Sequence, residues 1–391
     1  MNAPPRGVRA VLRAPGALPL LAARTIGSLP NGMVPLGLVL LLRAHGRSYG
    51  LAGLVSGCYS VGVAVAGPLL GRLVDRAGMQ RVLVPLAFAF PAAVAGAVVA
   101  VTTAAGAVAA CALALCCGAT LPPLGPCMRA LWPSLVQGTA MRTAAFAIDA
   151  SLQEIAFVGG PPLLAGLVVL AGPAVALLAA ALAGAAGASI FAWRARGRHV
   201  VGPHGGGALR SGQVRRLLLT SLFLGGAFGS VEVAMPAFCE AHGARAAAGV
   251  VLAALALGSG IGGVTFGARA ARGVPVHRFA VAATAFAVLL VPMLAAPSIV
   301  VMALLALVAG APIAPAFAAA YVLLDRFSVS GAATETFAWN TTMIFVGAAT
   351  GAGAGGILIA QAGGFQAALV LAAALAGAAA LTVLAQSRRL L

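Results

Sequence analysis

The amino-acid sequence predicts an all-α membrane protein with twelve transmembrane helices arranged as two six-helix pseudo-repeats. The 391 residues are 62% hydrophobic and 8% charged, whereas soluble domains average roughly 45–50% apolar residues. The charged residues are concentrated between long apolar runs. A chain of this composition can expose so many apolar side chains only to lipid, and this indicates a membrane protein.

Twelve apolar segments are long enough to cross a bilayer, whose hydrocarbon core of about 30 Å needs roughly 20 helical residues. Breaks rich in charge, Gly or Pro separate them. The segments are residues 17–42, 49–71, 82–103, 105–130, 143–170, 172–193, 215–239, 247–268, 277–297, 298–324, 334–360 and 364–386. The first apolar stretch continues to Leu42, which is too long for a cleaved signal peptide, so we expect it to remain as a span.

The positions of the arginines predict the orientation of the chain. All 24 basic residues are arginine, and twenty of them fall in the two termini and in the connections on the same side of the membrane. Positive residues stay cytoplasmic during insertion. We therefore expect a cell-membrane protein with both termini in the cytoplasm. The net charge of +17 then reflects topology and not nucleic-acid binding, because no aromatic residues alternate with the arginines.

A basic, glycine-rich linker lies near the midpoint of the chain. We expect a first bundle at 1–193, a cytoplasmic linker at 194–214 and a second bundle at 215–391. A shift of 196 residues aligns five residues of the first half with five of the second, namely Gly53, Gly62, Gly67, Gly71 and Arg76 with Gly249, Gly258, Gly263, Gly267 and Arg272. A shift of 191 aligns AFAID at 145–149 with TFAWN at 336–340. Matches that keep their order favour parallel repeats.

The stretch GRLVDRAGMQRV at 71–82 places a charge cluster between the second and third spans. Its G-x-x-x-D-R-x-G pattern, in a chain with six plus six spans, resembles the signature loop of the major facilitator superfamily. The matching residues are Gly71, Asp75, Arg76 and Gly78. The resemblance implies this family's fold, and a loop that holds the two halves together on the cytoplasmic side.

By the same resemblance, Asp75 would contact the start of span 11 near Thr334 and Glu335. The arginines expected to balance these charges are Arg76, Arg81 and Arg129. Met79 and Gln80 stand where the family usually has basic residues. A solvated turn that only fixes topology is the alternative interpretation. GGPPLLAG at 159–166 loosely resembles a Gly-Pro motif of drug/proton antiporters, which suggests efflux.

Four charged residues are expected inside the spans that line the central cavity of the resembled fold. A charge at the bilayer centre costs about 2.5–3.5 kcal/mol, so it tends to have a function or a partner. We expect Glu154 and Glu232, together with Asp149, to carry protons or to contact a cationic substrate. The alternative is a static ion pair, such as Arg24 with Asp149, that positions helices. Gln153 shares the helix face of Asp149, whereas Glu154 lies about 140° away.

Uncharged residues of two spans also point to the cavity. LPNGMVP at 29–35 interrupts the first span, and broken helices free backbone groups that must meet protein or water. Asn31 is therefore a candidate substrate contact, with a packing kink as the alternative. Trp339 and Asn340 offer an aromatic wall with a hydrogen-bonding group. Further along span 11, a GxxxGxxxG face from Gly347 favours close helix packing.

No motif for a cofactor, a metal or an enzymatic reaction stands in a suitable context. GSGIGG at 258–263 lies in an apolar span without a preceding strand, so it predicts helix packing and not a dinucleotide site. The six cysteines have no CxxC spacing, and the five histidines all fall in connections. We therefore expect no cofactor, no metal site and no enzyme.

The sequence favours a secondary active transporter that works by alternating access. The first hypothesis is proton-coupled export of a small amphipathic molecule, and the expected partners are that substrate, protons and the lipid bilayer, with the protein as a monomer. A second hypothesis is proton-coupled or facilitative uptake of a metabolite. A third, from a different class, is a membrane scaffold or sensor that transports nothing.

Overall fold

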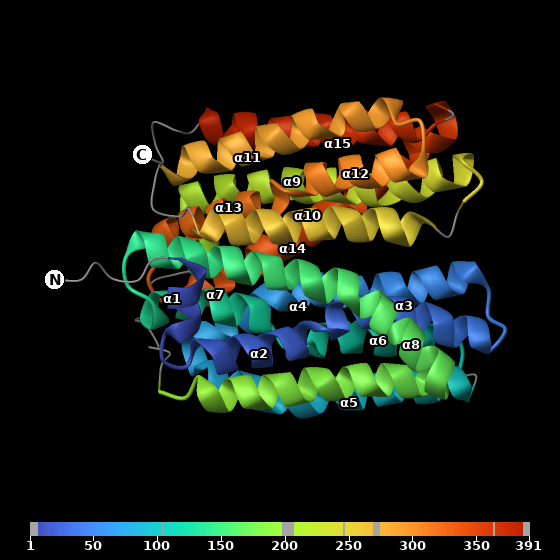
Figure 1. Ribbon diagram of the computed structural model, residues 1–391. Coiled ribbons are helices and arrows are strands. Elements are labelled where there is room, and N and C mark those ends of the chain that lie inside the picture. Colours follow the sequence, from blue (N-terminus) through green and yellow to red (C-terminus); the bar gives the residue numbers. More distant parts are fainter. Residues whose placement is uncertain are drawn as a thin grey trace.

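The structure is a computed structural model that describes residues 7–103, 105–197, 207–244, 247–268, 274–362 and 364–385. Every element assigned in these ranges is helical, and this confirms the predicted all-α fold class. The long helices run side by side along one direction (Figure 1). The first half of the chain, in blue and green, forms one bundle, and the second half, in yellow to red, forms the other.

The first half contains eight helices in the described residues: α1 (Val8–Arg13), α2 (Ala17–Ser28), α3 (Pro30–Ala44), α4 (Tyr49–Ala77), α5 (Met79–Thr102), α6 (Ala107–Thr120), α7 (Leu124–Leu135) and α8 (Thr139–Arg194). A straight helix of 56 residues would be about 84 Å long, far more than a bilayer needs. The backbone of α8 leaves helical geometry at Gly172, where φ is 82°. This positive φ suits glycine, and here α8 turns back to cross a second time (Figure 1).

The second half contains the 3-10 helix η1 (Ala208–Arg210) and then α9 (Gly212–Ala241), α10 (Ala248–Ala268), α11 (Pro275–Leu290), η3 (Pro292–Ala295), α12 (Ile299–Gly310), α13 (Ile313–Phe327), α14 (Ala333–Ala362) and α15 (Phe365–Leu384). The described residues hold 11 segments long and apolar enough to span a membrane, one of which is the whole of α8. Because α8 crosses twice, these segments give the twelve predicted crossings.

Serine side chains begin three of these helices. The hydroxyl oxygens of Ser48, Ser211 and Ser298 accept hydrogen bonds from the backbone N–H groups three residues later, at 3.2–3.3 Å. Each bond satisfies one of the free N–H groups at a helix start. The points at which α4, α9 and α12 begin are therefore determined by the serine that directly precedes each helix.

Three of the predicted spans are each built from two helices. The first span breaks at Leu29, between α2 and α3, where the sequence predicted an interruption. The fourth span breaks at residues 121–123, between α6 and α7, and the tenth breaks between α12 and α13. Both of these spans are continuous in the sequence-based prediction. Prolines occupy both breaks, and proline removes a helical N–H donor.

A local repeat supports two related halves. The tripeptide Ala-His-Gly occurs at 44–46 and at 241–243, and its alanine is the last residue of α3 and of α9, respectively. His45 Nδ1 lies 2.9 Å from the carbonyl of Leu41, and His242 Nδ1 lies 2.9 Å from the carbonyl of Phe238. The following glycine has φ near 70° in both places. The two halves thus end equivalent helices in the same way, although the domain boundaries themselves stay a prediction.

Glycine pairs bring helices of the second half into backbone contact. A Cβ on Gly258 or Gly262 would overlap the carbonyl oxygens of Leu307 and Ala311, so α10 packs directly on the end of α12. GSGIGG is therefore a helix-packing motif, as predicted. Gly347 of α14 packs on the backbone of α9 in the same way. The part of the repeat at Arg272 lies outside the described residues.

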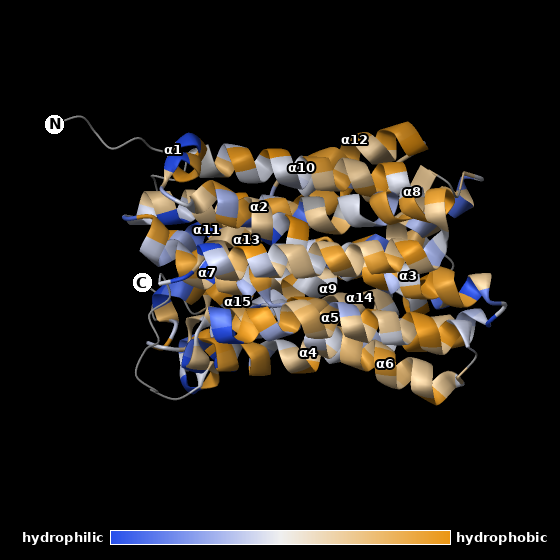
Figure 2. Ribbon diagram, turned by 90° about the horizontal axis from the view of Figure 1, so that it is seen from below, coloured by the Kyte–Doolittle hydropathy of each residue, from blue (hydrophilic) through white to orange (hydrophobic). Residues whose placement is uncertain are grey.

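The surface has the polarity of a membrane protein. Apolar residues cover the middle of the bundle, and hydrophilic residues gather towards its ends (Figure 2). Large apolar side chains are exposed on many helices; Val108 and Val169 each keep 85% of their surface accessible. Only lipid can cover so much apolar surface without cost. The chain is a multi-pass membrane protein, while its orientation in the membrane stays a prediction.

Candidate functional site

Asp75, at the end of α4, binds the start of α14 in the other half of the chain. Its carboxylate accepts hydrogen bonds from the backbone N–H groups of Thr334, at 3.0 Å, and Glu335, at 2.8 Å. The first N–H groups of a helix have no partner within the helix and carry partial positive charge. A buried carboxylate is therefore well suited to this position. We call the end of the bundle that holds this contact the Asp75 end.

Gly71 allows the close approach that this contact requires. It lies one turn before Asp75, and a Cβ there would come within 2.9 Å of the Ala338 side chain and 3.0 Å of the Glu335 Cα. Any larger residue would separate α4 from α14. Gly78, which follows α4, has φ of 89° and joins α4 to α5 without any intervening loop. The two glycines of the motif thus have steric and conformational roles, respectively.

The charge partner of Glu335 is Arg72, a residue that the sequence analysis did not select. The Arg72 guanidinium donates to both carboxylate oxygens of Glu335, at 3.0 and 3.2 Å. Arg76 and Arg81 were expected in this role, but both are exposed. Neither has a hydrogen bond or ion pair within the described part of the chain. Residues three apart share a helix face. Arg72 is three residues before Asp75, so a sequence-based prediction could have placed Arg72 on the same face, towards Glu335.

A second ion pair links the two halves at the Asp75 end. Arg142, near the start of α8, donates to Asp325, near the end of α13, at 3.3 Å. This pair is absent from the sequence-based predictions. Its carboxylate is largely buried, whereas the arginine side chain is 39% exposed. Together with the Asp75 and Glu335 contacts, it holds the Asp75 end closed.

A buried cluster of charges lies deeper in the first half. Asp149 of α8 lies between Arg24 of α2, at 3.1 Å, and Arg129 of α7, at 2.7 Å. The Gln153 carbonyl oxygen accepts hydrogen bonds from both guanidinium groups. Asp149 and Gln153 share a helix face, as expected from the sequence. The pairing of Arg24 with Asp149 corresponds to the alternative interpretation, a static ion pair, and not to the first hypothesis that Asp149 carries protons. All three charged side chains are at most 1% exposed.

Arg129 belongs to this cluster and not to the Asp75 end, which corrects the sequence-based assignment. Besides Asp149 and Gln153, it donates to the Thr341 hydroxyl of α14, at 3.3 Å. Its guanidinium also lies 4.0 Å from the centre of the Tyr321 ring, a cation–π contact. The cluster contains two cations and one anion. It fixes α2, α7 and α8 to one another and reaches the second half through Arg129.

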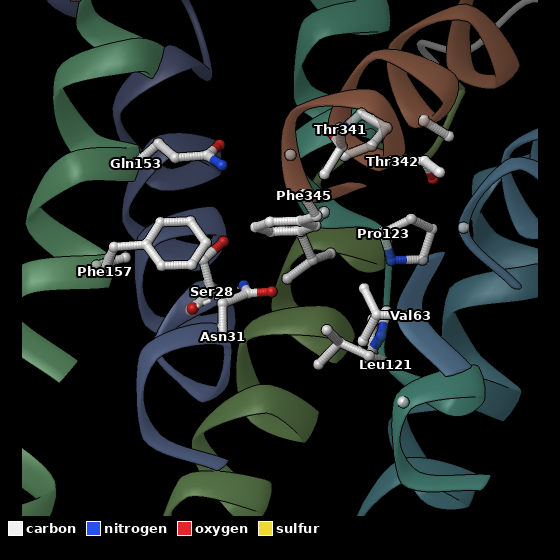
Figure 3. A pocket seen from close by; sticks show the side chains of 18 residues that line it. Ser28, Asn31, Val63, Leu121, Pro123, Gln153, Phe157, Thr341, Thr342 and Phe345 are labelled. Carbon is white, nitrogen blue, oxygen red and sulfur yellow. Dashed lines mark hydrogen bonds between the residues drawn. The ribbon is translucent and has the colours of Figure 1, made fainter. Parts of the chain in front are cut away.

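Two cavities meet at the centre of the molecule. The first is lined by α2, α3, α4, α6, α7, α8 and α14 and includes Ser28, Asn31 and Thr341 (Figure 3). The second, of about 170 Å³, lies between α8, α9, α13 and α14. Gln153, Phe157 and Phe345 line both. The Phe157 and Phe345 rings contact edge to face across the two halves, with centres 5.6 Å apart, and so partly separate the cavities.

Glu154 and Glu232 both line the second cavity. Glu154 comes from α8 in the first half and is 8% exposed, whereas Glu232 comes from α9 in the second half and is exposed. Throughout the described ranges, neither carboxylate has a hydrogen bond or an ion pair. Phe228, Phe317 and Tyr321 line the same cavity. Two carboxylates without partners therefore face a largely aromatic space between the halves.

The remaining residues selected from the sequence lie in different environments. Asn31 lines the first cavity. Its Nδ2 donates to the Ser28 carbonyl at 2.8 Å, so it also provides a hydrogen-bond donor for a backbone carbonyl at the junction of α2 and α3. Trp339 packs against the apolar core and lines neither of the two cavities. Asn340 is buried and accepts a hydrogen bond from Ser221 of α9 at 2.7 Å. The aromatic wall of the central space comes instead from Phe157 and Phe345.

The cysteine and histidine side chains form no recognisable centre in the described ranges. All six cysteines are free. In the same ranges, no three His, Cys, Asp or Glu side chains lie where they could jointly hold a metal ion.

Comparison with known proteins places this geometry among membrane transporters. Residues 20–278 match the model of the Major Facilitator Superfamily. A bacterial homologue of the iron transporter ferroportin, in the outward-facing state, superposes with a TM-score of 0.77 at 16% identity, covering 95% of this chain and 99% of that one. The human organic anion transporter MFSD10 gives a TM-score of 0.72 at 18% identity, with 94% and 97% covered.

A third similar structure is the E. coli fucose:proton symporter FucP. Its TM-score is 0.71 at 14% identity, and the alignment covers 95% of this chain and 98% of that one. No curated protein sequence matches this chain. At these identities the structural likeness shows the fold alone, and it confirms the predicted twelve-span architecture.

Proposed function

The chain belongs to the Major Facilitator Superfamily of secondary transporters, and we propose that its transport is coupled to protons carried by Glu154 and Glu232. The observation that supports this proposal is the contrast among the carboxylates inside the membrane-spanning helices. Asp149 is held by two guanidinium groups, whereas Glu154 and Glu232 face a cavity without partners. An ionisable residue without a partner inside a membrane-spanning segment is a candidate for a functional role, because a charge there is costly.

Their positions suit a transport cycle. Glu154 belongs to the first half and Glu232 to the second, so movement of the halves changes the surroundings of both groups together. Removal from water disfavours the charged form of a carboxylate. Exposure to water on one side of the membrane would therefore release a proton, and enclosure would retain it. The polar contacts at the Asp75 end provide the closed side of such a cycle.

The substrate that best fits this cavity is a small amphipathic molecule with a positive charge. Aromatic rings of Phe157, Phe228 and Phe345 would contact its apolar part, and aromatic faces attract cations. The carboxylates would bind the cation when they are deprotonated. Competition between substrate and protons for the same groups produces antiport, so we favour export by a monomer in the cell membrane, with both termini in the cytoplasm.

Uptake of a metabolite together with protons is the second candidate. The first cavity supports it, because Ser28, Asn31 and Thr341 offer hydrogen-bonding groups there. One structurally similar protein is a fucose:proton symporter. A neutral polar substrate would occupy this cavity, and Glu154 and Glu232 would then bind only protons.

The experiment uses purified protein in liposomes. A thermal-shift panel of amphipathic cations and neutral metabolites first identifies a ligand, whose movement is then followed under an imposed pH gradient. Export by antiport predicts that the ligand moves against the proton flux. E154Q and E232Q should abolish the response to the gradient. They should also weaken binding of a cationic ligand, whereas exchange of a neutral ligand for itself should persist.

The matched control is E240Q, which removes an exposed carboxylate at the end of α9, outside both cavities. It should transport like the unmodified protein. Gradient-driven transport that persists in E154Q and E232Q would remove both residues from the mechanism. Movement of the ligand with the protons would favour uptake over export.

A further inference from the structure

A cavity at the Asp75 end, distinct from the central cavities, is lined mainly by basic side chains. Its volume is about 420 Å³, and its six lining residues are Arg72, Arg76, Gly207, Leu209, Arg210 and Arg215. Arg72 and Arg76 lie at the end of α4. Gly207, Leu209 and Arg210 belong to the segment that leads into α9, and Arg215 lies in the first turn of α9. The cavity is therefore bounded by both halves of the molecule.

Most of this positive charge is not balanced by other residues that the structure describes. Arg72 is paired with Glu335, and Arg215 donates to the backbone carbonyl of Leu209 at 3.1 Å. Arg76 and Arg210 are exposed and make no hydrogen bond or ion pair with any described residue. Four guanidinium groups thus share one carboxylate, and three formal positive charges remain. Like charges held together repel one another unless an anion lies between them.

The cavity is also in direct contact with the ion pair that closes the Asp75 end. A Cβ placed on Gly207 would lie 3.1 Å from the Glu335 carboxylate and would overlap the Arg72 guanidinium. The backbone of Gly207 therefore covers the ion pair between Arg72 and Glu335. If α4 moved away from α14, the arginines of α4 would also move away from Arg210 and Arg215. The cavity is complete only while this end is closed.

We propose that this cavity binds a phosphate group and that the bound phosphate favours the closed Asp75 end. Guanidinium groups match phosphate through paired N–H donors. The cavity lies where membrane-spanning helices end, and basic pockets at that depth meet lipid phosphates. The source is either an anionic lipid headgroup or free phosphate. A ligand that binds only one of two conformations shifts the equilibrium towards it.

Binding is tested first, because it does not depend on the transport mechanism. Full-length protein is placed in nanodiscs of phosphatidylcholine with increasing phosphatidylglycerol, or in pure phosphatidylcholine with inorganic phosphate, and thermal stabilisation is measured. R210A and R215A, alone and combined, should raise the ligand concentration needed for half-maximal stabilisation about tenfold or more for each arginine removed. R13A removes an exposed arginine of α1 outside the cavity and should leave the response unchanged.

A response to phosphatidylglycerol alone assigns the site to a lipid, and a response to inorganic phosphate assigns it to a free anion. Equal stability under all these conditions would overturn the proposal. So would a response that R210A, R215A and R13A reduce to the same extent, since charge alone would then explain it.

The effect on the Asp75 end is measured separately. T334C places a thiol at a residue that is fully buried in the closed state, so its maleimide labelling reports opening. The phosphate ligand should slow this labelling severalfold, and combined R210A and R215A should remove the difference. Faster labelling in the presence of the ligand would contradict the proposed closing effect even if binding itself were confirmed.

Discussion

The carboxylate of Asp75 lies 2.8 Å from the backbone nitrogen of Glu335, and this contact joins α4 to α14 across 260 residues of sequence. The neighbouring N–H group of Thr334 is bound by the same carboxylate. The contact unites a short sequence motif with the N-terminus of a helix in the other half. It is therefore the natural point at which to test how this end of the molecule closes.

We expect D75N to open the Asp75 end more often. Asparagine has nearly the same shape, but it is uncharged, and its NH₂ group would face an N–H donor. Hydrogen bonds to a charged group contribute about 1.5–3 kcal/mol, so the open population should rise about tenfold or more. The measurement is the maleimide labelling rate of T334C with and without D75N. Equal rates, after subtraction of labelling at the native cysteines, would contradict the role of Asp75.

The glycines of α4 offer a matched pair of substitutions. In G71A the new methyl would lie 2.9 Å from the Ala338 side chain, whereas in G67A the nearest atom is the Thr342 hydroxyl at 3.6 Å. Both changes raise helix propensity equally, so they differ in packing alone. G71A should speed T334C labelling and reduce transport, while G67A should leave both nearly unchanged. The same effect from both variants would show that close packing at Gly71 does not matter.

The two carboxylates of α8 should differ in their effect on stability. D149N leaves two buried guanidinium groups without a counter-charge, and loss of one partner of a buried ion pair costs about 3–5 kcal/mol. E154Q removes a carboxylate that has no partner and should not lower the melting temperature. Thermal unfolding of the two purified variants in the same detergent makes the comparison. Similar losses of stability in both would contradict this division of structural and functional roles.

The fold could be predicted from the sequence because its signals are local. Apolar segments of sufficient length and arginines confined to connections gave twelve crossings, and Gly172 turns the chain at the uncharged break between two of them. The breaks between α6 and α7 and between α12 and α13 were missed. Apolar content does not distinguish a continuous helix from two short ones, although Pro122, Pro123 and Pro312 were visible signals.

The site was predictable only in part, because pairing between distant helices depends on their rotation. The contact of Asp75 with Thr334 and Glu335 agrees with the family resemblance, and the shared face of Asp149 and Gln153 follows from helix geometry. The partnership of Arg72 with Glu335 and the location of Arg129 required the packed structure. So did the ring contact of Phe157 with Phe345, which no sequence motif marks.

The central claim is that protonation of Glu154 and Glu232 controls opening of the Asp75 end. In the closed state Glu154 is buried and has no partner among the described residues. Opening of this end would admit water and favour release of the proton. At Glu154 the closed state would therefore bind more protons, and by linkage lower pH should favour it.

The most direct measurement is the labelling rate of T334C in liposomes as a function of pH, divided by the rate of an exposed reference cysteine, R13C. This ratio removes the pH dependence of the thiol itself. We predict that the ratio falls as the pH is lowered and becomes independent of pH when E154Q and E232Q are combined. A pH dependence that persists unchanged in the combined variant would contradict the claim.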